Sequence, residues 1–185
     1  MPVPTSQEPP FTRSLADGRC MLVREVEPED RFLIETGFRE LSVQSRFFRF
    51  MNAHPNLSEA ELNRFAASSD ADHFAIGAVE TGEGPPLPAA IARYIRLPQA
   101  PGSAEIAITV VDRYQGLGIG GLLLAQLSDR AARDGIDTFV AHVSPMNRAM
   151  LGLLRRHGAQ DVQSARDEVE LRLPVPIASG VQSAA

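Results

Sequence analysis

The sequence predicts a mixed α/β fold with a central, mostly antiparallel sheet flanked by helices. Two observations support this prediction. Short β-branched and apolar runs recur along the chain as strands, and segments with helical spacing follow the fourth and fifth of these runs, where they suit crossover connections. At 185 residues, the chain is long enough to bury one substantial core.

The composition of the two ends sets the predicted domain boundaries. Residues 1–17 are rich in Pro, Ser and Thr and lack the basic start and apolar centre of a signal peptide, so we expect a flexible lead-in. Residues 174–185 have a similar composition and are predicted to form a tail. A single domain is therefore expected over residues 18–173.

Charge and cysteine content narrow the class of partner. The net charge of −5, with acids and bases interspersed, argues against nucleic acid and allows a cationic amine substrate. No apolar run is long enough to span a membrane. The single cysteine, Cys20, fits a reducing compartment, so we expect a cytoplasmic protein. We expect no bound metal, and a homodimer remains open.

The first half of the chain alternates strand and helix signals. Residues 19–26 predict a strand, and Pro28 begins a helix that continues to Leu41. The next segment, 41–51, is expected to form a helix or turn whose phenylalanines enter the core, while its arginines could line a site entrance. Ser58 and Glu61 form a capping box for a short helix that ends near residue 68.

The second half is predicted to complete the sheet. Residues 72–80 and 88–96 form a hairpin, and a Pro-Gly break precedes a strand over 104–111. A helix begins near Ile119 and stops at Gly135, and a buried strand covers 136–143. Ser144 is expected to cap a helix that ends at Gly158, and residues 167–173 form the last strand.

A glycine-rich loop joins the strand over 104–111 to its helix. Glycines at 116, 118, 120 and 121 would leave unobstructed N–H groups at the positive end of the helix, which suits a phosphate or pyrophosphate. A dinucleotide site is disfavoured because four residues separate the strand from the first glycine, no acid ends the next strand, and little chain remains. A P-loop lacks its Lys-Ser/Thr, and a purely structural glycine turn stays open.

The motif QGLGIG at 115–120 resembles the Q/R-x-x-G-x-G/A signature of the GNAT acyltransferases. Four longer segments resemble the acetyltransferase domain of bacterial Pat-type protein lysine acetyltransferases: DGRCMLVREVEPED, LSVQSRFFRF, AEIAITVVDRYQGLGIGGLLL and NRAMLGLLRRHGA. The resemblance implies the GNAT fold, with a splayed parallel pair formed by the strands over 104–111 and 136–143. Acetyl-CoA would be the co-substrate, and an amine the acceptor.

The resemblance also assigns roles to the glycine loop and the strand before it. The pantetheine arm would pair with backbone groups around Thr109, Val110 and Val111, and an N–H near Val111 would face the thioester carbonyl. The pyrophosphate would lie near Gln115 on the N–H groups of Gly116, Leu117, Gly118, Ile119, Gly120 and Gly121.

The expected general base is Glu105, because it lies in an apolar strand at the place where some GNAT members carry a glutamate base, and we expect it to be partly buried there. His142 is the alternative base, although we expect it to be a buried histidine whose hydrogen bonds are satisfied. His73 and Asp112 are weaker candidates. Asn147 matches the family's asparagine and could bind the pantetheine or a water, or simply cap its helix.

The chain departs from the family pattern at one helix. The tyrosine that often protonates the leaving thiolate, seven residues after the asparagine, is Leu154 here, and the usual Gly-Phe is Gly158-Ala159. The expected function is acetyl transfer from acetyl-CoA to a primary amine, either of a small molecule or of a protein lysine. The alternative is an acyl-CoA sensor with little transferase activity.

Overall fold

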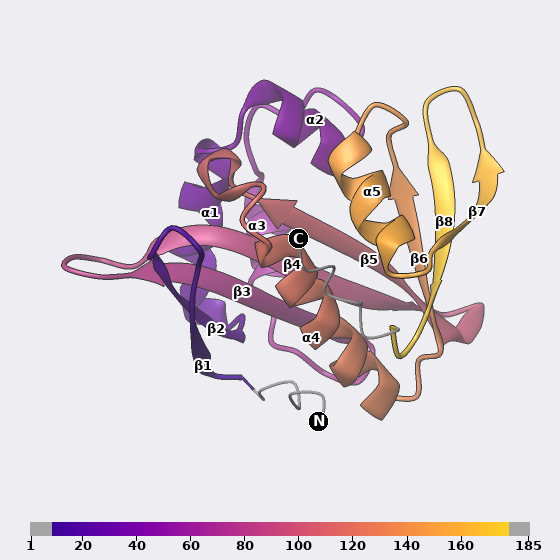
Figure 1. The fold of residues 1–185 in the computed structure, drawn as a ribbon, viewed down its shortest axis with the longest axis horizontal. Helices are drawn as coiled ribbons and strands as arrows, with labels where there is room; N and C mark the ends of the chain where they lie inside the picture. Colours follow the sequence, from indigo (N-terminus) through magenta and orange to yellow (C-terminus); the bar gives the residue numbers. More distant parts are fainter. Residues whose placement is uncertain (1–8, 178–185) are drawn as a thin grey trace.

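The computed structural model describes residues 9–177, which build an eight-stranded sheet with helices on both faces (Figure 1). The strands are β1 (Phe11–Ser14), β2 (Cys20–Glu25), β3 (His73–Thr81), β4 (Leu87–Leu97), β5 (Ala100–Val110), β6 (Thr138–Val143), β7 (Gln160–Ser164) and β8 (Val169–Pro174). The helices are α1 (Arg31–Arg39), α2 (Val43–Phe50), α3 (Glu59–Phe65), α4 (Ile119–Arg133) and α5 (Arg148–Arg156), with 3-10 turns η1 (Pro28–Asp30) and η2 (Asp112–Tyr114).

The sheet has the strand order β1-β2-β3-β4-β5-β6-β8-β7. Every neighbouring pair is antiparallel except β5 and β6, which are parallel and are connected through α4. A parallel pair needs such a crossover, because the chain must return to the starting edge of the first strand. The predicted mixed sheet with one parallel pair is therefore confirmed.

Two consecutive residues of β4 show how the helices divide between the faces of the sheet. The Tyr94 hydroxyl donates to Asp134, directly after α4, while Arg93 donates to the carbonyl of Phe65 at the end of α3 at 3.0 Å. Since successive side chains of a strand point to opposite faces, α4 and α3 cover opposite faces. The start of α4 also packs on α5, where an added Cβ at Gly120 would lie 3.4 Å from Leu153.

The two edge strands, β1 and β7, were not predicted. β1 lies within the presumed lead-in, and only one of its four residues, Phe11, is buried, while all five residues of β7 are exposed. An edge strand pairs on one side only and leaves little hydrophobic alternation to read from the sequence. Residues 11–14 thus belong to the domain, which begins earlier than the expected boundary at residue 18.

The described part of the predicted tail also packs on the domain. Val175 is buried, and the Ile177 N–H donates to the Ser128 hydroxyl of α4 at 2.8 Å. The expected end of the domain at residue 173 is therefore too early by at least four residues. Residues 1–8 and 178–185, which complete the predicted lead-in and tail, lie outside the described residues.

Helix ends follow local chemistry, with one exception. The capping box of Ser58 and Glu61 is present, and the helix stops Gly135 and Gly158 have φ of 76° and 96°. The expected start of α5 at Ser144 is wrong, because residues 144–147 form a turn and the helix begins at Arg148. A Ser-Pro pair favours a turn as readily as a helix start.

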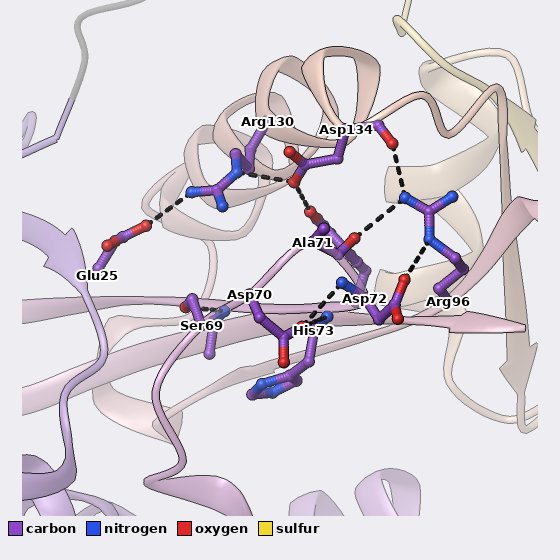
Figure 2. A network of polar contacts seen from close by, with 11 residues as sticks. Glu25, Ser69, Asp70, Ala71, Asp72, His73, Arg96, Arg130 and Asp134 are labelled. Atoms are coloured by element: carbon purple, nitrogen blue, oxygen red, sulfur yellow. Dashed lines mark hydrogen bonds and ion pairs between the residues drawn. The ribbon is translucent and has the colours of Figure 1, made fainter.

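A polar network fixes the C-terminal end of α4 on the sheet (Figure 2). Arg130 pairs with Asp134 at 2.8 Å and with Glu25 of β2 at 2.9 Å. Arg96 of β4 donates to Asp72 at 2.7 Å and to the Asp134 carbonyl at 2.6 Å. These contacts hold one end of α4 against the sheet, and its glycine-rich beginning lies at the opposite end of the helix.

Candidate active site

The parallel strands β5 and β6 separate part of the way along their length. Their pairing covers only three residue pairs and ends at Glu105 and Val140, although β5 continues to Val110 and β6 to Val143. A cleft of about 1140 Å³ opens there between the strands. This is the splayed pair that the family resemblance implies.

The cleft walls come from α2, β5, the glycine loop, the start of α4, β6 and α5. Ten of the expected site residues line it: Glu105, Thr109, Val110, Gln115, Gly116, Gly118, Ile119, Gly120, Gly121 and Asn147. Val111 and Leu117 do not. Val111 lines a smaller pocket on the α1–α3 side of the sheet, and Leu117 packs against the hydrophobic core.

The backbone of β5 offers hydrogen-bonding groups to the cleft, but not at Val111. The Val111 N–H already donates to the Ala89 carbonyl on β4 at 2.9 Å. Because N–H groups along an antiparallel ladder point alternately to the two sides of a strand, the Val110 N–H points away from β4, toward the gap left by β6. The N–H that faces the cleft near Val111 is therefore that of Val110, whereas the Val111 N–H is already bonded to β4.

Gln115 braces this end of β5. Its side-chain amide donates to the Val110 carbonyl at 3.0 Å and to the Ser45 hydroxyl of α2 at 3.2 Å. The side chain thereby links the end of the strand to α2 across the mouth of the cleft. Because the Gln115 amide is already hydrogen-bonded within the protein, Gln115 would affect ligand binding by holding the loop in place.

The glycines at the start of α4 serve two different purposes. Gly116 and Gly118 have φ of 76° and 84°, and a Cβ added at either would meet no atom within 4 Å. They are needed for their backbone conformation, and the loop is open to an approaching ligand. Gly120 and Gly121 instead accommodate Leu153 of α5, so a side chain at 120 would first disturb helix packing.

The beginning of α4 fits an anionic group. The first N–H groups of a helix lack intrahelical partners and lie at its positive end. Two cations that the sequence analysis missed, Arg148 and Arg156 of α5, line the same cleft, and among the described residues neither forms an ion pair. The two arginines lie roughly two helical turns apart, and this spacing could have indicated from the sequence that both lie on one face of α5.

Glu105 lines the cleft where the two strands part, directly opposite Val140. Its neighbours Ala104 and Ile106 are buried, so by alternation its side chain points to the other face of the sheet. The expected partial burial is wrong, because Glu105 is exposed in the open cleft. A carboxylate in this position can reach both solvent and a ligand that enters the splay.

His142 lines the opposite wall of the cleft. The expected burial of this histidine is wrong, because the side chain is 37% exposed, but the expected partner is present, since its Nδ1 lies 2.8 Å from the Glu168 carboxylate. A carboxylate on one ring nitrogen orients the ring and fixes the role of the other nitrogen. His142 therefore remains the second candidate for proton transfer.

The other polar candidates have structural partners. Asp112 accepts hydrogen bonds from Ser42 and Ser45 at the start of α2. His73 borders the network at the far end of α4 and lines neither pocket (Figure 2). The Asn147 oxygen accepts the Met150 N–H at 3.1 Å, so the side chain caps α5 while its N–H groups stay available to a ligand.

Two further features bear on chemistry. Leu154 is 1% exposed and belongs to the core, so the helix position that often holds a tyrosine contributes no acid here. Within residues 9–177, no group of His, Cys, Asp and Glu side chains is arranged to hold a metal ion. None of the described helices combines the length and apolarity required to cross a bilayer.

Comparison with known proteins agrees with this geometry. A profile of the acetyltransferase (GNAT) family matches residues 38–159. An acetyltransferase of Pseudomonas aeruginosa is 33% identical over 143 residues, which cover 77% of this chain and 76% of the relative. Acetyltransferase Pat of Mycolicibacterium smegmatis is 32% identical over 167 residues, 90% of this chain and 49% of the relative.

Solved structures give the same result. The GNAT domain of S. lividans PAT superposes with a TM-score of 0.81 at 27% identity, covering 89% of this chain and 96% of that domain. A cAMP-binding acyltransferase of Mycobacterium smegmatis superposes with a TM-score of 0.60 at 30% identity, covering 90% of this chain and 47% of that protein. The chain thus spans about half the length of these mycobacterial relatives. The splayed strands, the glycine loop and the matched sequence establish that the chain belongs to the GNAT acetyltransferase family and is an acyltransferase.

Proposed function

We propose that the protein transfers an acetyl group from acetyl-CoA to a primary amine by direct attack within a ternary complex. The observation that carries the proposal is the parting of β5 and β6 at Glu105, with the open glycine loop in the same cleft. One cavity of about 1140 Å³ thus combines an end suited to an anion with the Glu105 carboxylate, which could accept a proton. A protein lysine and a small-molecule amine are both acceptors that this cleft could admit.

Binding rests on the start of α4 and on α5. The unpaired N–H groups after Gly118, with Arg148 and Arg156 nearby, would hold the phosphates. Acetyl-CoA, when bound, supplies the acetyl group as an activated thioester. The Val110 N–H would stabilise the negative charge that develops on the carbonyl oxygen.

Glu105 would supply the base. An amine of ordinary pKa is mostly protonated at neutral pH, so its nitrogen must lose a proton before it can form the new C–N bond. Glu105 accepts that proton, directly or through a water, because it is exposed at the entrance of the splay. The departing sulfur takes a proton from solvent, since Leu154 offers none.

The proposal is tested with Glu105→Gln, which keeps the size of the side chain and removes its basicity. We expect kcat/KM to fall about 10²- to 10⁴-fold, the usual contribution of a general base, while the Kd for acetyl-CoA is retained. His142→Gln is the matched control on the opposite wall. If Glu105→Gln turns over normally across the pH range and His142→Gln does not, the base is His142.

A sensor of acyl-CoA is the second candidate, favoured by the buried Leu154 in place of an acid. Calorimetric binding of acetyl-CoA and a thiol-release assay against amines and lysine peptides separate the two functions. Saturable binding with no release above background on any acceptor would support the sensor. Release that depends on an amine and saturates with it would support the transferase.

A further inference from the structure

The smaller pocket lies on the α1–α3 side of the sheet and has a volume of about 100 Å³. We call it the inner pocket, defined by side chains of α1, α2 and α3 over β2–β5. It shares four lining residues with the cleft, Arg49, Phe50, Ala107 and Thr109, so the two spaces adjoin. A group bound in the cleft beside Glu105 therefore lies next to the inner pocket.

The charges around the inner pocket do not balance. Five charged side chains line it. Arg24 pairs with Asp30 at 2.5 Å, and Glu25 pairs with an arginine of α4 at 2.9 Å. For the remaining two, Arg49 and Arg93, no ion-pair partner is found among residues 9–177. Two guanidinium groups in a mostly apolar space thus have no ion pair among the described residues. Burial lowers the pKa of Arg49, and the nearby Glu105 carboxylate opposes that shift without forming an ion pair.

Arg93 is the more deeply placed of the two. It is 6% exposed, and its hydrogen bond to the Phe65 carbonyl, 3.0 Å long, occupies one of its five N–H groups. Burial, followed by the charges of Arg49 and Arg64, lowers the pKa of Arg93 to about 9, so it stays charged at neutral pH. A buried charge without a counter-ion is costly and calls for an anion.

Arg49 stands between the inner pocket and the cleft. Its guanidinium lies 5.1 Å from the ring centre of Phe50 and 5.6 Å from that of Phe65, on which Arg93 also stacks at 4.6 Å. Aromatic rings hold a guanidinium in place but leave its in-plane N–H groups free for a planar acceptor. Two arginines held beside one ring can therefore present their N–H forks to a carboxylate.

We propose that Arg49 and Arg93 form a carboxylate-binding subsite, and that one of the two substrates carries a carboxylate into the inner pocket. The carboxylate belongs either to the acceptor amine or to the far end of a dicarboxylic acyl group. The inference rests on the proposed function in that the cleft must admit an acyl-CoA and an amine.

Sheet geometry sets the length of a suitable substrate. Arg93 faces Ala107 across the β4–β5 ladder, and Glu105 lies two residues earlier on β5, on the same face. Diagonal neighbours of this kind are about 7–8 Å apart. A molecule whose nitrogen and carboxylate are separated by a few carbon atoms can therefore reach Glu105 and the subsite together.

The experiment has two arms. In the first, 4-aminobutyrate and lysine are compared with their carboxamides as acceptors of acetyl-CoA. In the second, the Kd for succinyl-CoA is compared with that for butyryl-CoA, which lacks the terminal charge. We expect a preference of about tenfold to a hundredfold for the carboxylate in one arm, since hydrogen bonds to a charged group are the strong ones.

Variants connect the preference to the subsite. Arg93→Gln and Arg49→Gln should each bring the preference toward unity, and Arg93→Lys should retain part of it. Arg64→Gln is the matched control, because Arg64 also stacks on Phe65, at 5.3 Å, but does not line the inner pocket. If Arg93→Gln unfolds, Arg49→Gln on the more accessible side of the pocket still tests the subsite.

The outcomes separate this inference from the proposed function. Equal use of carboxylates and carboxamides, together with equal affinity for the two acyl-CoA compounds, would overturn the subsite even in an active enzyme. Tighter binding of succinyl-CoA that Arg93→Gln abolishes would support the subsite even if no acceptor were acetylated. A preference that survives both glutamine variants would also overturn it.

Discussion

Substitution of Asp112 tests whether this residue supports the structure of the site or takes part in the chemistry. Its carboxylate accepts three hydrogen bonds at the start of α2, from the Ser42 N–H at 3.0 Å, the Ser42 hydroxyl at 2.7 Å and the Ser45 hydroxyl at 3.0 Å. It also places a negative charge at the positive end of that helix. Because α2 carries Arg49 into the cleft, Asp112→Ala should loosen one wall of the site.

The cost of Asp112→Ala follows from these contacts. Asp112 is exposed, so water replaces part of what is lost, and each hydrogen bond contributes at the low end of its range, about 0.5 kcal/mol. The interaction with the helix end adds about 0.5 kcal/mol, so the total is about 2 kcal/mol. For a chain of this size, the expected fall in Tm is about 4–8 °C.

The pH dependence has a defined sign. Burial alone would raise the pKa of Asp112, but the hydrogen bonds from Ser42 and Ser45 outweigh it and hold the pKa below its ordinary value. A depressed pKa means that the stabilisation is complete above the unfolded value of about 3.9 and is lost as the pH falls through the folded value. The difference in Tm between wild type and Asp112→Ala should therefore be constant near neutrality and shrink in acid.

The assay is thermal unfolding across pH, with steady-state kinetics on the same samples. The control is Asp167→Ala, which removes an exposed aspartate in the turn between β7 and β8. It should leave the free energy of unfolding within about 0.5 kcal/mol of the wild-type value. The expected kinetic result for Asp112→Ala is a raised acceptor KM. An unchanged Tm together with a large loss of kcat would refute the reasoning and make Asp112 part of the chemistry.

Two further predictions concern backbone strain and a buried ion pair. Gly118→Ala should lower the free energy of unfolding by about 1–2 kcal/mol and weaken acetyl-CoA binding, because φ is 84° there although an added Cβ meets nothing within 4 Å. Gly82→Ala is the control, since it is equally unobstructed but has no positive φ, and it should change neither the unfolding free energy nor the acetyl-CoA affinity, both measured by calorimetry. Equal effects of the two substitutions would contradict the strain argument. Asp30→Asn should cost about 2 kcal/mol at pH 7, less than for a fully buried pair because Arg24 is 29% exposed. Burial favours a higher pKa for Asp30, yet hydrogen bonds from Arg24 and the Glu27 N–H lower the pKa overall. The stabilisation by this pair should therefore persist above about pH 3.9 and disappear only in stronger acid, as measured by urea unfolding. A loss of stability already at pH 6 would point to another group.

Elements with a strong local signal were predictable from the sequence. The Ser58 and Glu61 capping box, the glycine stops after α4 and α5, and the β3–β4 hairpin depend on neighbours in the chain and formed as expected. The edge strands β1 and β7 could not be read, since their pairing depends on partners that the fold brings to them. The start of α5 was missed because Ser144 and Asn147 both offer a cap, and only the surrounding structure selects between them.

The sequence by itself determined the mixed sheet, the glycine loop and the presence of Glu105 on the strand before it, because hydrophobic period and glycine spacing are local properties. Only the tertiary structure decided where these residues point. It placed Glu105 in the open gap left by β6, turned the Val111 N–H toward β4 and so assigned the cleft-facing donor to Val110. It also brought Arg49 and Arg93, far apart in the chain, to one pocket, where neither forms an ion pair with another residue of the described range 9–177. Whether a charged side chain has an ion-pair partner depends on its neighbours in the folded structure, so residue spacing in the sequence could not predict it.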